Sequence, residues 1–451
     1  MTEVRTVGRI GLFAAPMVAS TILALGAQFG VVGLLGALGG PALYVRSVYG
    51  PVSLLFLALA AGLAVAQQVA AARALGGGTP HRVAGLLAST ARIGLVCYAV
   101  LGVVLLAAME PLAHLMTVVA ADRPLFYRFL VAMVLVLPIG FLGELCAATL
   151  RGAGFPTRGL LVTLVSFVMT VGGVAVLGFG AGLGIAAVPI ATGVSGLGEL
   201  ALGLWLLRRA GLLSGAGWRR SDREARQLTR GIGIPVAASY LLLFVVDTVF
   251  LRIVAAHGQG AVAGFTLGYT LQSAVILPAV GLGAAIAVLI NQAIGGGDIP
   301  LARLVLRNGV ILVAVVYGVL TLALMAFGRA AVEPLSDDPA TAHEAVRFMT
   351  VVGPAFGATG LILALLTLLE QTGRGLVAVA LNIIYFAALS VTGAWYAGVT
   401  HSTEGLYRVL AAGAVIGMIT GAPIAWVLLR RQIAEAGAAA RDRDDEELMM
   451  S

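Results

Sequence analysis

Two stretches, GLFAAPMVAS at residues 11–20 and RGIGIPVAAS at residues 230–239, open two copies of one long repeat. At a constant offset of 219, residues 11–80 lie over residues 230–299 without a gap, so that Pro16 falls on Pro235. The loop Gly76-Gly77-Gly78 falls on Gly295-Gly296-Gly297 in the same register. A repeat of this length indicates a chain built from two similar lobes.

The composition assigns the chain to the polytopic membrane proteins. Hydrophobic residues make up 60% of the 451 positions and charged residues 11%, against roughly 45–50% and about 25% in soluble domains. The 60 glycines are scattered through the apolar runs, where small residues allow transmembrane helices to approach closely. A duplicated membrane chain of this kind is typical of transporters whose substrate path lies between two lobes.

Twelve apolar segments are long enough to cross a membrane, which takes about 20 residues. They are residues 10–37, 48–72, 90–110, 126–149, 159–180, 184–207, 231–256, 262–291, 303–327, 346–369, 376–399 and 406–429. Six spans per lobe is an even number, so both lobes enter the membrane from the same side. We therefore predict an all-α fold of twelve transmembrane helices in two six-helix bundles related by pseudo-twofold symmetry.

The basic residues predict the orientation. All 28 are arginine, and with the N-terminus inside, 21 fall in inner segments and 7 in outer ones. This bias places both termini in the cytoplasm, and we expect a multi-pass protein of the inner (plasma) membrane. The net charge of +7 is accounted for by topology and by anionic membrane lipids, so no nucleic-acid partner is expected.

Composition shifts divide the chain into four parts. Residues 1–209 form the N-terminal lobe, 210–230 a polar cytoplasmic connector and 231–431 the C-terminal lobe. The charged segment 432–451 is expected to be a disordered cytoplasmic tail.

Carboxylates at membrane depth are the strongest functional candidates, because a charged side chain there costs at least roughly 2.5–3.5 kcal/mol. Asp247 lies about fifteen residues into its span, roughly 22 Å deep at the helical rise. Tyr240 and Phe244 share its helix face, and a carboxylate beside aromatic rings suits an organic cation. A structural aspartate bonded to a neighbouring hydroxyl or amide is the alternative.

Three further acidic residues lie within or at the end of predicted spans, and their expected roles differ. Glu199 lies near the middle of the sixth span and Glu144 in the inner half of the fourth. Either could take part in cation coupling, although Glu144 could instead pair with an interfacial arginine. Glu370 ends the tenth span, where we expect a solvated interfacial side chain.

Other polar residues could line a cavity, although hydrogen bonds between helices explain such residues equally well. These candidates are Gln28, Gln272, Asn382 and Tyr385. Pro16 and Pro235 occupy matching places near the start of each copy, so we interpret them as candidate hinges, with packing kinks as the alternative.

Several motifs together resemble one known family. They are Gly11-Leu-Phe-Ala-Ala-Pro16, Ala72-Arg-Ala-Leu-Gly-Gly-Gly78, Asn291-Gln-Ala-Ile-Gly-Gly-Gly-Asp298 and Leu150-Arg-Gly-Ala-Gly154. In order and spacing they resemble the multidrug and toxic compound extrusion (MATE) family over most of residues 8–430. The resemblance implies a secondary antiporter of two six-helix bundles that exports mostly cationic organic compounds in exchange for protons or sodium ions. Many members carry an aspartate in the first span; here Gln28 holds that place, while Asp247-Thr248 resembles the motif.

Other chemistries fit the sequence less well. The glycine triplets are not followed by Gly-Lys-Ser/Thr and the chain has no lysine, which excludes a nucleotide-binding P-loop. No histidine spacing suggests a metal site and no nucleophile–base pair is visible, so we expect neither a cofactor nor an enzyme. The alternative transport function is a flippase for a lipid-linked oligosaccharide or related amphipathic metabolite, whose diphosphate would favour arginines in the cavity. We expect a monomer that binds a small, cationic substrate.

Overall fold

The computed structural model describes residues 3–39, 41–213, 222–332 and 338–450. In this part of the chain every regular element is a helix. Eleven helical runs are long and apolar enough to cross a membrane, and one of them, Pro339–Thr400, has 62 residues. That run contains the predicted tenth and eleventh spans, separated at Gly373, whose φ of 119° is not helical. The prediction of twelve membrane-spanning helices is thus confirmed.

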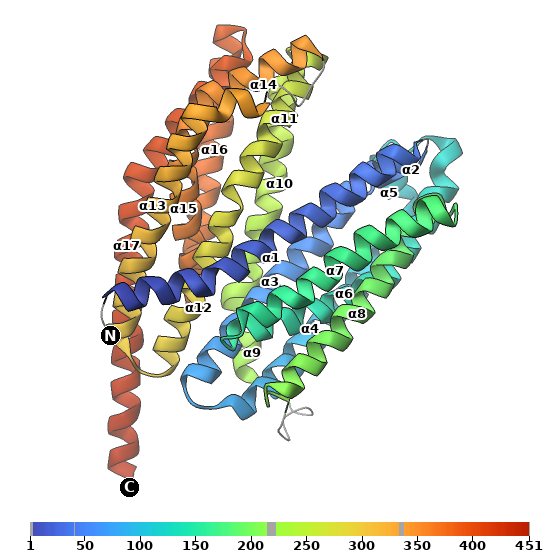
Figure 1. Cartoon of the computed structure of the whole chain (residues 1–451). Coiled ribbons are helices and arrows are strands. Elements are labelled where there is room, and N and C mark those ends of the chain that lie inside the picture. The colour runs from blue at the N-terminus through green and yellow to red at the C-terminus, as the bar shows by residue number, and fades with distance from the viewer. Residues whose placement is uncertain (1–2, 40, 214–221, 333–337, 451) are drawn as a thin grey trace. The chain divides into compact units, whose positions relative to one another are not determined.

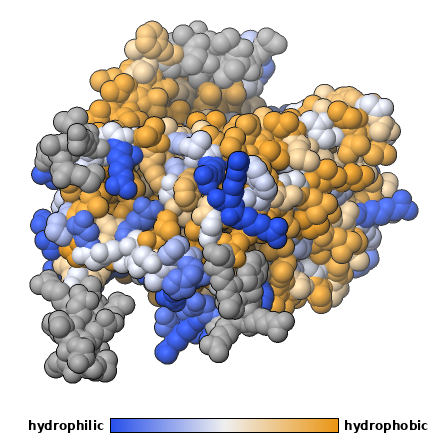
Figure 2. Space-filling view, turned by 60° about the horizontal axis from the view of Figure 1, so that its bottom comes forward, coloured by the Kyte–Doolittle hydropathy of each residue, from blue (hydrophilic) through white to orange (hydrophobic). Residues whose placement is uncertain are grey.

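The helices form two compact units. The first unit is Ala19–Ala237, and the second unit is Met1–Val18 together with Ala238–Ser451. In a space-filling view, apolar side chains cover most of the visible surface (Figure 2). An apolar exterior is expected of helices that face lipid.

In the first unit, α6 is the central helix and contacts α3, α4, α7 and α8 (Figure 1). The helices assigned to this unit are the second part of α1 (Glu3–Leu38), α2 (Pro41–Val48), α3 (Gly50–Gly76), α4 (Val83–Ala107), α5 (Met109–Leu115), α6 (Arg123–Gly152), α7 (Pro156–Ala175), α8 (Ala187–Arg209) and α9 (Arg223–Leu228). A π-helical turn, Thr229–Gly233, joins α9 to α10.

In the second unit, α15 contacts α11, α12, α13, α16 and α17. Its helices are α10 (Ile234–Ala255), α11 (Gln259–Ile276), α12 (Pro278–Gly295), α13 (Ile299–Val332), α14 (Pro339–Val352), α15 (Phe356–Leu369), α16 (Gly375–Thr400) and α17 (Thr403–Met450). The predicted eighth span is two helices, because Pro278 begins a new one. Asp338 caps α14 by accepting hydrogen bonds from Thr341, which lowers the pKa of the Asp338 carboxyl.

Helices α1 and α10 each belong to both units. The start of α1 is buried in the core of the second unit, where Ile10, Ala14 and Met17 are at most 4% exposed. Its later part lies in the first unit, where Gly26 faces the ring of Phe167. The contact-based division therefore differs from the predicted lobes 1–209 and 231–431, because hydropathy locates a helix without indicating which neighbours its faces contact.

Close packing depends on glycine at helix crossings. A Cβ atom at Gly196 of α8 would lie 2.7 Å from the backbone nitrogen of Gly140 in α6. A Cβ atom at Gly283 of α12 would lie 2.8 Å from the carbonyl oxygen of Ala364 in α15. Both positions agree with the interpretation of the scattered glycines as helix-contact residues.

The segment predicted as a disordered tail is helical here. Helix α17 continues to Met450 and extends beyond the other helices of its unit (Figure 1). Its first tail residues are held by contacts: Arg374 forms a two-pronged ion pair with Glu435, with both distances 2.8 Å. The alanine-rich stretch 436–440 has high helix propensity, which a reading by charge alone overlooks.

Candidate functional site

Asp247 of α10 forms a hydrogen-bonded pair with a residue of the following helix. The Tyr269 hydroxyl of α11 donates to Asp247 Oδ1 over 2.5 Å. Asp247 is partly buried, and no ion pair involves it among the described residues. Its negative charge is therefore not balanced by an arginine, which leaves it available for a cation.

The rings around this pair come largely from other helices than α10. Phe265 stacks on Tyr269 with ring centroids 5.3 Å apart, and Phe348 meets Phe265 edge-on at 5.7 Å. Tyr407 lies parallel to Phe265 at 6.2 Å. Aromatic faces and an unpaired carboxylate together suit an organic cation.

Tyr240 and Phe244 are half-buried on α10, two turns and one turn before Asp247 respectively. The sequence placed both on the Asp247 face, which the helical spacing of α10 supports. The stacked rings at Tyr269, in contrast, are brought together only by the packing of α11, α14 and α17.

At the far side of the aromatic cluster lies a second acid, Glu344 of α14, which the sequence did not indicate. It accepts hydrogen bonds from Tyr407 at 2.8 Å and from Thr403. Arg347 lies 3.6 Å from its other oxygen. Glu344 is 8% exposed, and these partners satisfy the hydrogen-bonding capacity and the charge of its carboxylate. Its role is therefore structural: it connects α14 to α17. The spacing of Glu344 and Arg347, three residues apart on one helix, was the available signal.

Glu370 differs from its expected solvated state. It is 8% exposed, and its Oε1 accepts a 2.5 Å hydrogen bond from Ser239 of α10. Asn382 of α16 in turn donates to Ser239 at 3.4 Å. The prediction was wrong because Glu370, in the π-helical segment Glu370–Arg374, packs against α10, where the Ser239 hydroxyl takes the place of solvent. Like Asp247, Glu370 has no ion pair in the described part of the chain.

The two acids predicted in the first unit have different surroundings. Glu199 is 9% exposed, accepts a 3.4 Å hydrogen bond from Ser195 and has no basic partner among the residues described. Glu144 pairs with Arg151 at 2.5 Å, the alternative that the sequence left open. Arg151 also donates to Gln68 at 3.1 Å. Because Arg151 balances its charge, Glu144 is a weaker candidate for cation coupling than Glu199.

The remaining cavity candidates are dispersed. Gln28 is exposed on α1, and Tyr385 of α16 meets the ring of Phe386 at 5.2 Å. Gln272 lies one turn after Tyr269 on α11, and its buried Oε1 has no hydrogen-bond partner within the described residues. A buried acceptor without a donor is costly, so Gln272 is the best candidate of the three for contacting a ligand.

A polar network that the sequence did not single out lies in the first unit. Gln67 of α3 donates to Thr149 at 3.1 Å and accepts from Thr90 at 2.9 Å. All three side chains are at most 1% exposed. This network joins α3, α4 and α6, and its satisfied bonds favour a structural role.

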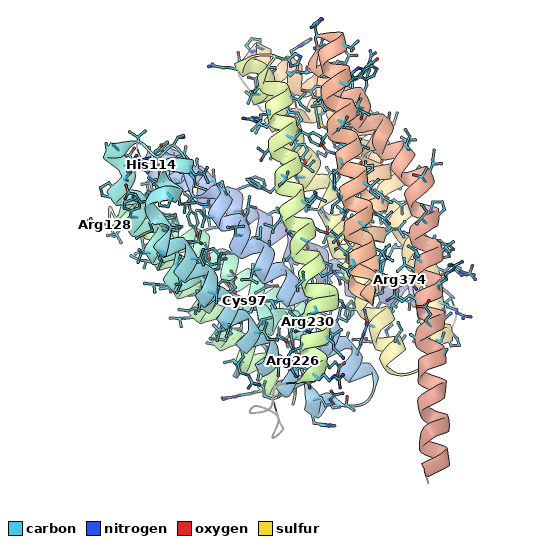
Figure 3. The ribbon with its side chains drawn as sticks, turned by 180° about the vertical axis from the view of Figure 1, so that it is seen from behind. Cys97, His114, Arg128, Arg226, Arg230 and Arg374 are labelled. Carbon is cyan, nitrogen blue, oxygen red and sulfur yellow. The ribbon has the colours of Figure 1, made fainter. Side chains whose placement is uncertain are left out.

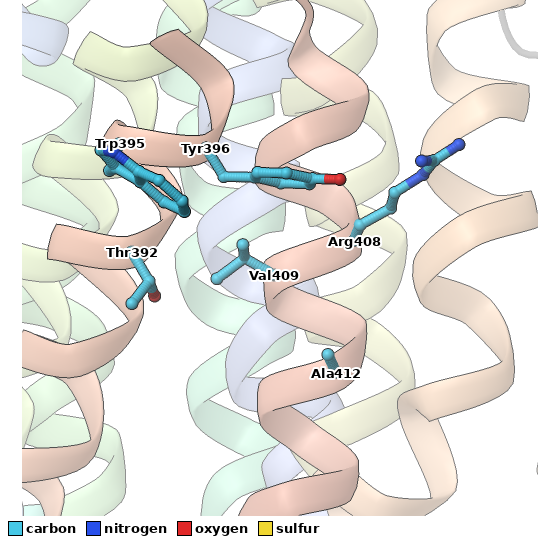
Figure 4. A pocket seen from close by; sticks show the side chains of 6 residues that line it. All are labelled: Thr392, Trp395, Tyr396, Arg408, Val409 and Ala412. Atoms are coloured by element: carbon cyan, nitrogen blue, oxygen red, sulfur yellow. The ribbon is translucent and has the colours of Figure 1, made fainter. Parts of the chain in front are cut away.

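One open pocket of about 320 Å³ lies between α16 and α17 (Figure 4). Its lining residues are Thr392, Trp395, Tyr396, Arg408, Val409 and Ala412. None of these is acidic, and Arg408 is already paired with Glu404 at 2.5 Å. The pocket is therefore not the site that Asp247 and its neighbours define. No group of three potential metal ligands occurs in residues 3–39, 41–213, 222–332 and 338–450.

The fold defines a class, a polytopic helical membrane protein, in which Asp247, Glu199 and Glu370 form no ion pair among the described residues. Comparison with known proteins is more specific. The MatE family model matches residues 16–191 and 235–396. The chain belongs to the MatE family, a family of transporters, which confirms the resemblance seen in its motifs.

Individual relatives agree with this assignment. The chain is 24% identical over 362 residues to "Probable multidrug resistance protein YoeA" of Bacillus subtilis (strain 168), covering 76% of each protein. Its fold is similar to that of the Vibrio cholerae MATE transporter VcmN in the bent form, with a TM-score of 0.88, 17% identity and coverage of 97% and 99%. It is also similar to an outward-facing multidrug resistance MATE family transporter, with a TM-score of 0.85, 18% identity and 96% coverage of both chains.

Proposed function

We propose that this protein is a secondary active efflux transporter that exports organic cations by antiport with protons or sodium ions. The observation that carries the proposal is the Asp247–Tyr269 pair, a carboxylate with no basic partner in the described residues, beside stacked aromatic rings. Such a group can bind either an organic cation or a coupling ion, but it does not bind both at the same time. Competition for one negative charge is sufficient to couple the two fluxes.

The proposed cycle is alternating access. An organic cation from the cytoplasm binds at Asp247 and is carried to the outward-facing state. A proton or sodium ion then neutralises the carboxylate and releases the cation outside. Glu370 and Glu199 are the other deep acids without a basic partner among the described residues, and they are the candidates for a second ion site. Gln272 supplies a further acceptor one helical turn from Tyr269.

The division of the chain supports hinges at the two matched prolines. The first unit begins after Val18 and ends at Ala237, and these residues differ by 219, the offset of the sequence repeat. Each boundary follows its proline, Pro16 or Pro235, by two residues. Proline removes one helical hydrogen bond and makes bending easier. We propose that both helices bend there when the units move.

The name of the Bacillus subtilis relative, a probable multidrug resistance protein, supports a small-molecule cargo. The flippase alternative needs basic groups that bind a diphosphate. The candidate side chains with no ion pair among the described residues, Asp247, Glu199 and Glu370, are instead acidic. We therefore favour a cationic substrate and no enzymatic step. We also propose that the protein works as a monomer, surrounded by membrane lipids, without nucleic acid or a bound cofactor.

The arginine distribution supports an inner-membrane protein with both termini in the cytoplasm. Reporter fusions test this orientation: a reporter after Arg431 should be active in the cytoplasm and one near Asp337 outside. Both reporters on one side would contradict it.

Transport is tested with the purified protein in proteoliposomes. Movement of an ethidium-like dye should be driven by an imposed proton gradient or by an imposed sodium gradient, and the gradient that works identifies the coupling ion. A protein that moves the dye under neither gradient, but moves a lipid-linked oligosaccharide, would favour the flippase function.

A further inference from the structure

The connector between the two halves of the chain has two chemically different faces. Helix α9 continues through the π-helical turn into α10, and its side chains Ala225, Leu228 and Ile232 are buried. They face the first unit, where α9 contacts α3 and α4. The described part of the connector, from Asp222 onward, is therefore packed against its unit.

The acidic side chains of the connector are directed toward the protein. Arg82 pairs with Glu224 at 2.9 Å and with Asp222 at 3.5 Å. The backbone nitrogen of Asp222 donates to Ser89 at 2.9 Å. These contacts fix the rotation of α9 and use its negative charges internally.

The basic side chains point the other way. Arg223, Arg226 and Arg230 are exposed, and none of them forms an ion pair among the described residues. They are three and four residues apart, the spacing of one helix face. Figure 3 shows Arg226 and Arg230 on successive turns of the chain at the same end of the first unit. The fold leaves three positive charges on one face without a partner.

We propose that this face, Arg223, Arg226 and Arg230, binds the headgroups of anionic phospholipids. The three arginines open the run Arg223–Ala255, which continues as a membrane-spanning helix. Ile234, one turn after Arg230, is 58% exposed, so exposed charge changes to exposed apolar surface within one turn. The phosphate of a lipid would contact the arginines and its acyl chains would contact the apolar surface that follows. A soluble anion would contact only the arginines.

The end of helix α8 carries surface chemistry of the same kind. On α8, Trp205 is 51% exposed, and Arg209 stacks over its indole ring at 5.0 Å. Tryptophan beside arginine at a helix end is typical of the membrane interface. The inference rests on the proposed orientation, in which this end of the first unit faces the anionic cytoplasmic leaflet.

The test uses the full-length protein in detergent, titrated with phosphatidylglycerol or with phosphatidylcholine, with lipid binding counted by native mass spectrometry. Wild type should bind phosphatidylglycerol more tightly. Since one arginine near a lipid surface contributes about fivefold, the double variant R226Q/R230Q should bind phosphatidylglycerol about 30-fold more weakly. Binding of phosphatidylcholine should not change, and high salt should remove the difference.

Arg128 provides the matched control. It is exposed, has no ion pair in the described residues and lies at the opposite end of the first unit (Figure 3). R128Q should bind phosphatidylglycerol as wild type does. Unchanged affinity in R226Q/R230Q, an equal loss in R128Q, or no preference of wild type for phosphatidylglycerol would each overturn the proposal. Thermal unfolding in phosphatidylcholine confirms that the variants fold, and the reporter fusions test the orientation separately.

Discussion

Replacing Asp247 by asparagine tests the proposed cation site most directly. Asparagine retains an oxygen that can accept the hydrogen bond which Tyr269 now donates over 2.5 Å. The aromatic stack on Tyr269 does not involve the carboxylate and should remain. The loss in the free energy of unfolding should be small, about 1 kcal/mol, because only the charge-assisted part of one hydrogen bond is lost.

The effect on transport should be much larger. Two opposite unit charges about 4 Å apart attract by about 4 kcal/mol at an effective dielectric constant of 20. The variant loses this term, so its half-saturating concentration for an organic cation should rise by roughly two to three orders of magnitude. Gradient-driven transport should be abolished, because asparagine neither takes up a proton nor carries the charge that a sodium ion needs.

The assay is dye movement in proteoliposomes under imposed proton and sodium gradients. Glu199→Gln tests the buried acid of the first unit that has no ion pair among the described residues, and Glu110→Gln serves as a control at an exposed acid. If Asp247→Asn transports like wild type while Glu199→Gln does not, the coupling site lies in the first unit and the assignment to Asp247 is refuted.

Two further predictions concern the helices. If Pro16 is a hinge, Pro16→Ala should restore one helical hydrogen bond, raise the melting temperature by removing a cost of about 3 kcal/mol, and slow transport; Pro235→Ala should also slow it. Unchanged turnover in both variants would contradict the hinges. Gly196→Ala should lower stability by about 1–3 kcal/mol because its Cβ atom would meet the backbone of Gly140. Gly172→Ala, with no atom within 4 Å of the new Cβ, should not; equal thermal unfolding of the two variants would refute the packing argument.

The sequence predicted the helices well because each one carries its own hydropathy signal. All twelve predicted spans fall on helical segments. The orientation predicted from arginine and the close packing predicted from glycine likewise required no knowledge of which helices contact each other. The place of Asp247 along its helix was equally predictable, because it depends only on distance along the sequence. Its partner Tyr269 was not, since that contact depends on how α10 and α11 rotate against each other.

The errors have the same origin. Glu370 was expected at the surface because its apolar run ends at residue 369, yet a π-helical segment and the hydroxyl of Ser239 keep it buried. The bond between Gln432 and the backbone of Thr372 adds α17 to the same region. Contacts between distant helices decide such positions, and a one-dimensional pattern does not contain them.

The shared helix α1 also constrains how the chain is made. Ile10, Ala14 and Met17 are buried in a core with Ala285 and Ala425. At synthesis rates of about 5–20 residues per second, the ribosome needs roughly 14–55 s after Ile10 before Ala285 exists. Throughout that interval the first turns of the protein have no native partners and must be held by lipid or by the insertion machinery. The beginning of the chain is therefore among the last parts to reach its final packing, so folding cannot proceed strictly from the N-terminus.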